Sequence, residues 1–380
     1  IFAILMTICL MVSVLSVTVV ASFAAEELSA PAEGTLLRVT ATKGEDTVLI
    51  GDYTNFEDGW PKAIHEGLPR QTKVTKYERI IVDFYADWTS ADDGKFTDEN
   101  VEGFDNDTIE IPEGNVYEPF RASIEQWIRE VRALPYEEFS VRSFDGLTLY
   151  GKYYEYKPGA PIELMFHGYR GDADRDLCGG VQRCFALKRN TLIVDQRACG
   201  TSEGHVITFG IHESDDCHRW IAHLIDRFGG DVKIIITGIS MGASTVMLAA
   251  GRELPEQVVG VLADCGYTSA RDIIKAVIRK MKLPPNLAYP FVRLGARLFG
   301  HFDPDADSPV EAMKRCKVPV MFIHGEGGDF VPCDMSRRNY EACAATKKLW
   351  TVPDAGHGLS ILVDKSGYMR ELRAFFDPLL

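Results

Sequence analysis

The chain has 380 residues, of which 46% are hydrophobic and 25% charged, as is ordinary for a globular protein that buries a large core. Its net charge of -14 argues against a nucleic-acid partner, because such binding depends on neutralising phosphates with Lys and Arg. Residues 26–115 hold 21 Asp and Glu against 8 Lys and Arg, whereas the rest is nearly balanced. We therefore predict two modules behind an uncharged leader.

Residues 1–25, IFAILMTICLMVSVLSVTVVASFAA, form an apolar leader that is long enough to span a bilayer. The leader ends in small residues, and SFA before Ala25 has the small-x-small pattern of a signal-peptidase site. The chain begins with Ile1 rather than Met, so we expect the natural start to lie upstream. The leader predicts a signal peptide or a membrane anchor, and hence an exported protein in which residues 1–25 are the candidate membrane contact.

The number of cysteines favours a different cellular compartment from the one that the leader predicts. Cys9 lies in the leader and the other eight follow from Cys178 onward, in spacings that fit no zinc site. We expect them to be small buried hydrophobic residues. Because exported proteins favour paired or absent cysteines, a cytoplasmic origin of the second module stays open as an alternative.

Residues 26–115 predict an acidic, β-rich segment. TLLRVTA, TVLIGDY and RIIVDFYADW are rich in β-branched and aromatic residues, and acidic turns separate them. Over residues 33–115 the segment resembles the N-terminal part of secreted bacterial β-solenoid surface proteins. Its acidic turns fit no EF-hand spacing, so we predict solvated turns, with calcium binding as the alternative.

From residue 116 onward, apolar strand candidates alternate with helical patterns. This alternation predicts an α/β fold, with a mostly parallel sheet covered by helices on both faces. The expected strands are 138–143, 147–156, 162–167, 191–195, 233–239, 258–264, 318–323 and 348–352. The expected helices are 175–188, 213–228, 241–250, 271–282, 287–299, 334–345 and 364–377, and residues 119–134 also have helical spacing.

The sequence GISMG (238–242) lies between a buried strand and a helix of small residues. This context is typical of a nucleophile elbow, a sharp turn on which the Ser240 hydroxyl would project above the sheet. Acyl transfer also needs two amide donors for the developing oxyanion. We expect these to be the backbone N–H of Met241 and that of Tyr169, which lies in the loop HGYRG.

A serine nucleophile needs a general base. His357 follows the last predicted strand in AGHGLS, where flanking glycines give the loop freedom to bring the ring to the serine. We expect His167 and His324 to orient loops instead, and Asp195 and Arg197 to brace the loop DQRACGTSEG.

Six motifs occur in one order: SFDGLTLYGKYY, HGYRG, DQRACGTSEG, GISMG, HGEGGDFVP and AGHGLS. Through them residues 136–380 resemble the α/β-hydrolase superfamily, in particular bacterial serine hydrolases of the serine-aminopeptidase and lysophospholipase-like esterase type. The resemblance implies Ser240 as nucleophile, His357 as base and an acid after the seventh strand.

The acid is where this chain departs from the family. The usual form is H-G-x-x-D-x-x-V-P, and the register of HGEGGDFVP puts Gly328 where the aspartate is expected. Asp329, one position later, is the acid that we expect, and Glu326 is a weaker substitute. Loss of the acid would cost on the order of 10⁴ in rate.

Residues 268–310 predict a cap of two amphipathic helices separated by Pro284-Pro285. Its apolar side chains suggest an apolar acyl or aromatic part of the substrate.

Together, these motifs predict a serine hydrolase of carboxylic esters, with a small acyl substrate and no cofactor or metal. Peptides and thioesters stay open as substrates, and the alternative is a non-catalytic exported binding protein with a degenerate hydrolase domain.

Overall fold

The computed structural model describes residues 37–43, 46–53, 79–84 and 117–380, apart from residue 329. The first three segments are β1 (Leu37–Lys43), β2 (Asp46–Tyr53) and β3 (Arg79–Phe84), which pair antiparallel in the order β2-β1-β3. The predicted β-rich segment is confirmed over these strands. This small sheet and the sheet that follows belong to two separate compact units. The leader and the acidic turns lie outside the described residues.

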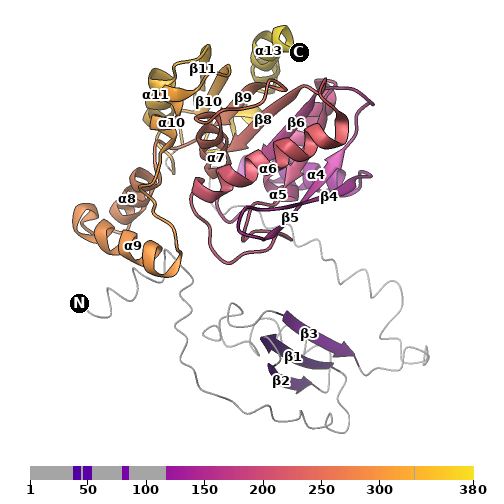
Figure 1. The fold of residues 1–380 in the computed structure, drawn as a ribbon, viewed down its shortest axis with the longest axis vertical. Helices are drawn as coiled ribbons and strands as arrows, with labels where there is room; N and C mark the ends of the chain where they lie inside the picture. The colour runs from indigo at the N-terminus through magenta and orange to yellow at the C-terminus, as the bar shows by residue number, and fades with distance from the viewer. Residues whose placement is uncertain (1–36, 44–45, 54–78, 85–116, 329) are drawn as a thin grey trace. The chain divides into compact units, whose positions relative to one another are not determined.

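The second unit contains an eight-stranded sheet in the order β11-β10-β9-β8-β6-β7-β5-β4 (Figure 1). β4 pairs antiparallel with β5, and β5 with β7, whereas every other pairing is parallel. All eight predicted strands are present. Their bounds are β4 Glu137–Arg142, β5 Thr148–Tyr154, β6 Ile162–Phe166, β7 Asn190–Val194, β8 Ile234–Ile239, β9 Val258–Asp264, β10 Val320–Gly325 and β11 Lys347–Val352.

Helices cover both faces of this sheet, as predicted. On one face, α6 (Ile211–Phe228), α7 (Met241–Ala250), α10 (Pro309–Arg315) and α11 (Cys333–Ala342) enclose the larger apolar core. On the other face lie α4 (Arg121–Arg132), α5 (Ala173–Ala186) and α13 (Lys365–Phe376). β6 and β8 lie at the centre of the sheet, and side chains from both helix layers pack on them. Apart from Glu163 in β6 and Thr237 in β8, their side chains are apolar.

The cap consists of α8 (Ala270–Lys280) and α9 (Pro285–Phe299), which pack against each other (Figure 1). The turn at Pro284-Pro285 separates them, as predicted. The predicted cap, 268–310, extends too far, because α10 begins at Pro309 and packs on α7 of the core. α10 and the four-residue helix α12 (Ser360–Val363) were not predicted, since neither is long enough to show a clear helical period.

Two glycines let α7 lie directly against the strands. A β-carbon at Gly238 would overlap the backbone of Gly242, and one at Gly242 would overlap the carbonyl of Phe166 in β6. The main chains of β6, β8 and α7 therefore approach more closely than any side chain would permit. This contact sets the position of the turn between β8 and α7.

Gly242→Ala should lower the free energy of unfolding by about 1–3 kcal/mol or more, because the added methyl group must displace α7 or β6. Gly295→Ala is the matched control, since a β-carbon there meets no atom within 4 Å inside α9. That control should stabilise the protein by about 0.5–1 kcal/mol. Denaturant unfolding of both variants measures the difference, and equal stabilities would contradict the packing described.

Candidate active site

Ser240 occupies the turn between β8 and α7 with φ 55° and ψ -114°. A positive φ is uncommon for a residue other than glycine and is strained, so the surrounding contacts must hold it. Its backbone N–H donates to the carbonyl of Asp264 in β9 at 2.8 Å, and its own carbonyl accepts from Ser244 at the start of α7. The side chain is 8% exposed. Ser240 thus lies on a sharp strand-to-helix turn, at the position where the sequence predicts one.

His357 lies in the loop after β11 and reaches the serine. Its Nε2 is 2.9 Å from Ser240 Oγ. The Tyr117 hydroxyl donates to the backbone carbonyl of His357 at 3.2 Å, and the ring of Phe330 lies 5.4 Å from the imidazole, centroid to centroid. The structure thus brings together two of the predicted catalytic residues, 117 positions apart in the chain.

The predicted acid, Asp329, lies outside the described residues. Both of its neighbours lie close to His357, Phe330 with its ring and Gly328 with its backbone. A β-carbon at Gly328 would lie 3.1 Å from the backbone nitrogen of His357, which leaves little room for a side chain there. Glu326, the weaker substitute, is bound elsewhere, because it forms a 3.0 Å ion pair with Arg337 at the surface.

The two predicted amide donors flank Ser240. Met241 is the first residue of α7, whose N-terminus carries a partial positive charge. The loop of Tyr169 lies close by, since a β-carbon at Gly168 would be 3.6 Å from that of Ser240. Within residues 117–380, excluding 329, neither backbone N–H donates to another residue. The structure thus places both predicted donors beside Ser240.

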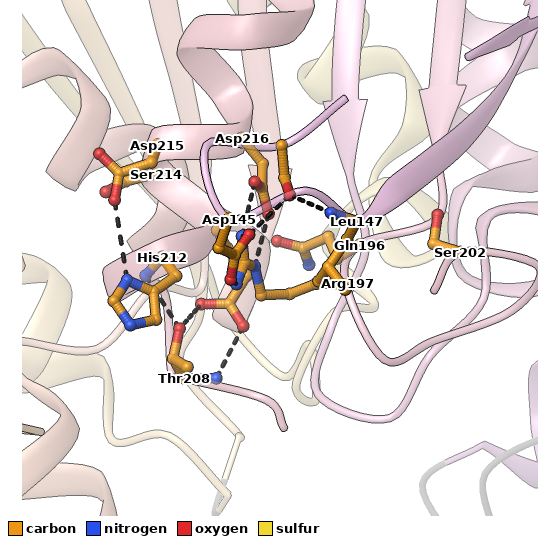
Figure 2. Close-up of polar contacts among 12 residues, drawn as sticks. Asp145, Leu147, Gln196, Arg197, Ser202, Thr208, His212, Ser214, Asp215 and Asp216 are labelled. Atoms are coloured by element: carbon orange, nitrogen blue, oxygen red, sulfur yellow. Dashed lines mark hydrogen bonds and ion pairs between the residues drawn. The ribbon is translucent and has the colours of Figure 1, made fainter. Parts of the chain in front are cut away.

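The loops around the site are held by buried polar contacts. His167 accepts a 2.9 Å hydrogen bond from the backbone of Gln196, and His324 contacts Ser336 and the carbonyl of Val331. Figure 2 shows the side chain of Arg197 between the carboxylates of Asp216 and Asp145, at 2.7 and 2.9 Å. Arg197 therefore ties the loop after β7 to α6 and to the β4–β5 turn.

A cavity of about 680 Å³, the large cavity, opens beside Ser240 and His357. It extends along the sheet face that α4, α5 and α13 cover. Ile124 and Trp127 of α4, Leu177 of α5 and Leu362 give it apolar walls.

Arg183, Asp264 and Tyr368 add polar side chains to the lining of the large cavity. The Tyr368 hydroxyl donates to Asp264 Oδ2 at 2.9 Å, and Arg183 pairs with the buried Glu163. Burial raises the pKa of Asp264 to about 6, although Tyr368 and Arg183 lower it. Burial alone would raise the pKa of Glu163 as well, but the charges of Arg183 and Arg189 hold it below its ordinary value.

Arg183, Asp264 and Tyr368 were not predicted as site residues. One signal was present, because Asp264 ends an apolar parallel strand, at the edge of the sheet where α/β proteins place their ligands. Arg183 gave no such signal, since its position in α5 does not show that the side chain is buried.

A second, smaller cavity of about 120 Å³ lies under the cap. It shares Ser240, Tyr169 and Phe330 with the large cavity. Its other lining residues are almost all apolar: Phe209, Tyr267, Ile273, Ile274, Val277, Ile278, Met281, Leu283 and Val292. The predicted cap thus lines a cavity at Ser240 with apolar side chains, and the two cavities share this serine. The apolar acyl or aromatic substrate stays a prediction.

Three other features concern metals, membranes and thiols. In the part of the chain that the structure describes, no group of His, Cys, Asp or Glu is arranged to hold a metal ion. None of the described helices combines the length and the hydrophobicity needed to cross a bilayer. The eight described cysteines are free thiols, and all but Cys333 are buried.

A family model described as "Alpha/beta hydrolase family" matches residues 164–366, which include Ser240 and His357. The chain belongs to the α/β-hydrolase family. This membership supports a hydrolase.

Curated relatives that match this chain include one bacterial and one yeast protein. The uncharacterised protein YqkD of Bacillus subtilis is 28% identical over 189 residues, or 50% of this chain and 62% of that protein. The chain thus spans less than two thirds of that relative. Protein bem46 of Schizosaccharomyces pombe is 25% identical over 250 residues, or 64% of this chain and 77% of that protein.

Solved structures share the fold. An esterase from Pyrococcus furiosus superposes with a TM-score of 0.55 at 21% identity, covering 66% of this chain and 93% of the esterase. The α/β hydrolase GrgF from Penicillium gives 0.53 at 15% identity, covering 65% and 99%. At these identities the likeness establishes the fold alone.

The raised pKa of Asp264 predicts a pH-dependent stability. Between its unfolded pKa near 4 and its folded pKa of about 6, the folded protein binds the proton more tightly, so stability falls as pH rises through this window. The free energy of unfolding falls by about 3 kcal/mol across this window. Asp264→Asn should remove it, so that wild type loses about 3 kcal/mol more than the variant between pH 4 and 7. Urea unfolding across this range measures the effect, and parallel pH profiles would contradict it.

Proposed function

We propose that this protein is a serine hydrolase that cleaves carboxylic esters through an acyl-enzyme intermediate. The observation that carries the proposal is the 2.9 Å contact between Ser240 Oγ and His357 Nε2, with Ser240 held at a positive φ beside two cavities. A strained serine within hydrogen-bond reach of an imidazole is the arrangement of an activated nucleophile.

The reaction would proceed in two halves. Ser240 Oγ attacks the carbonyl carbon while His357 Nε2 takes the hydroxyl proton, and the histidine then gives this proton to the departing alcohol oxygen. Water, deprotonated by His357, next attacks the acyl-enzyme, and the proton returns to Ser240 as the acid leaves. The N–H groups of Tyr169 and Met241 would stabilise the oxyanion in both halves.

Asp329 is the acid in this proposal. Its chain neighbours Gly328 and Phe330 both lie close to His357, and Glu326 forms an ion pair with Arg337. The tight fit of position 328 against the His357 backbone gives a physical reason for glycine where the family has its aspartate. An acid at 329 would orient the imidazole and stabilise its charged form.

The same chemistry would cleave thioesters or peptides, so the ester assignment rests on the two cavities at Ser240, which suit the two halves of a small ester. The proposal includes export or membrane anchoring through residues 1–25, which the apolar leader supports. The contrasting hypothesis is a non-catalytic binding protein, which the absence of a reactive Ser240 would favour.

The first test is labelling of the full chain with a fluorophosphonate probe. A single adduct at Ser240 is expected, because the probe reports an activated serine. Ser240→Ala should abolish labelling and ester turnover, and His357→Ala should do the same without unfolding the protein. Ser244→Ala, four residues along α7, is the matched control and should still label. A folded wild type that neither labels nor turns over esters would favour the binding protein.

The second test concerns the acid. Asp329→Ala should lower kcat for p-nitrophenyl butyrate by about 10²–10⁴, because the imidazole loses its orienting charge. Glu326→Ala is the control, and its rate should stay close to wild type because an exposed ion pair contributes little. If the two variants behave alike while Ser240 remains reactive, Asp329 is not the acid.

A further inference from the structure

Helix α9 of the cap carries an exposed apolar stripe. On its inner side the helix packs against α8 through buried side chains: Ala288, Tyr289 and Val292. Apolar side chains spaced three or four residues apart follow the outer side and are 45% to 67% exposed: Leu287, Phe291, Leu294 and Leu298. At a rise of about 1.5 Å per residue, this stripe is about 17 Å long. A contiguous exposed apolar patch marks a surface that binds a partner.

The cap is also basic, although the chain as a whole is acidic. Residues 270–300 contain seven Lys and Arg against one acid, whereas the whole chain has a net charge of -14. Two aspartates that follow α9 neutralise part of this excess through ion pairs with three arginines: Asp303 and Asp305 with Arg271, Arg293 and Arg297. Within residues 117–380, excluding 329, three exposed or half-buried cations of the cap pair with no acid: Lys275, Arg279 and Lys282.

These three cations lie beside the apolar stripe. Lys275 and Arg279 are four residues apart and so share one face of α8. The Lys275 ammonium donates to the side chain of Asn286 in α9 at 3.1 Å and lies 5.3 Å from the centre of the Tyr289 ring. Lys282 is in the turn between the two helices. Positive charge therefore flanks the stripe along α8 and at the start of α9.

The same part of the cap adjoins the small cavity. α8 provides most of the cap residues that line this cavity, and one of them, Val277, is itself exposed. Phe330, which lines both cavities, is also exposed, and the Lys280 ammonium lies 5.6 Å from the centre of its ring. The apolar lining of the site thus reaches the surface next to the basic end of α8.

We propose that the cap docks on a membrane surface that contains anionic lipids, with the α9 stripe in the interface and the α8 cations at the headgroups. Leucine and phenylalanine beside Lys and Arg are the pattern of helices that lie in the plane of a membrane. Lipid phosphates attract the cations, and the hydrocarbon accepts the apolar side chains. A second copy of the chain fits this surface less well, because a symmetric pair would bring the cations of two caps together.

The first test is co-sedimentation of the full chain with phosphatidylcholine vesicles, with and without phosphatidylglycerol. Wild type should bind the anionic vesicles about tenfold more tightly at low salt, and high salt should remove most of this difference because it screens the charges. Equal binding to the two kinds of vesicle, or binding to neither, overturns the proposal. Ser240→Ala should bind as wild type does, so a failure of the proposed hydrolase and a failure of docking are separate results.

Charge variants locate the electrostatic part. Arg279→Gln combined with Lys282→Gln should lower the affinity for anionic vesicles about tenfold or more, because each cation near the surface contributes to the attraction. Lys157→Gln combined with Lys233→Gln is the matched control, since both lysines are exposed but lie outside the cap. Equal affinities of the two double variants would contradict docking through the cap.

A tryptophan in the stripe reports on docking directly and does not depend on binding through residues 1–25. The emission of Leu294→Trp, taken as the difference from wild type, should shift to shorter wavelength on anionic vesicles and be quenched by brominated lipids. Tyr156→Trp is the matched control, because Tyr156 is 41% exposed but follows β5, outside the cap, and its emission should not change. Unchanged emission of Leu294→Trp on vesicles that bind the chain overturns the proposal.

Leu294→Glu distinguishes a membrane from a second copy of the chain. It should lower the affinity for anionic vesicles about tenfold or more, because a charged side chain resists transfer out of water. Tyr156→Glu should bind as wild type does. Analytical ultracentrifugation without lipid completes the comparison. If Leu294→Glu abolishes self-association of wild type and leaves vesicle binding unchanged, the stripe is an interface between copies and the membrane proposal is wrong.

Discussion

The site depends on the close main-chain contact of β6, β8 and α7. With glycine at positions 238 and 242, α7 begins against the carbonyl of Phe166, and Ser240 is forced into a positive φ at the edge of the sheet. The hydrogen bond from its N–H to Asp264 fixes the turn to β9 as well. A strained conformation persists only where its surroundings over-determine it, and here three main chains do so. The serine is therefore in place before any substrate arrives.

Much of this arrangement can be predicted from the sequence, for a physical reason. The central strands are nearly continuous apolar runs because both of their faces are buried, whereas β4 and β5 alternate between buried and more exposed residues. Both patterns are visible in the sequence, and the alternation of strands with helices predicted the mostly parallel sheet. Ser240 and His357 were identified because their glycine neighbours mark backbone geometry that few other residues permit. The short helices α10 and α12 were missed because they are held by packing on the core rather than by a helical pattern of their own.

The polar residues that line the large cavity, Arg183, Asp264 and Tyr368, could not be predicted in the same way. Arg183 and Asp264 are 81 positions apart, and what defines them is burial together with an unsatisfied atom, which only the folded arrangement reveals. The same holds for Glu163, a charged residue inside an apolar strand that two arginines neutralise. A sequence pattern reports which face of an element is apolar, but it does not report which charges meet across it. Both carboxylates were therefore predicted only as parts of strands.

Helix α4 has an evolutionary consequence. It precedes residue 164, where the family model begins, yet Ile124 and Trp127 form part of the wall of the large cavity and Tyr117, just before the helix, contacts the backbone of His357. A relative that keeps the common core but replaces this preceding helix would keep the serine and histidine and acquire a differently shaped cavity. Substrate choice in such a lineage can diverge by exchange of one peripheral element, without any change at the reacting atoms.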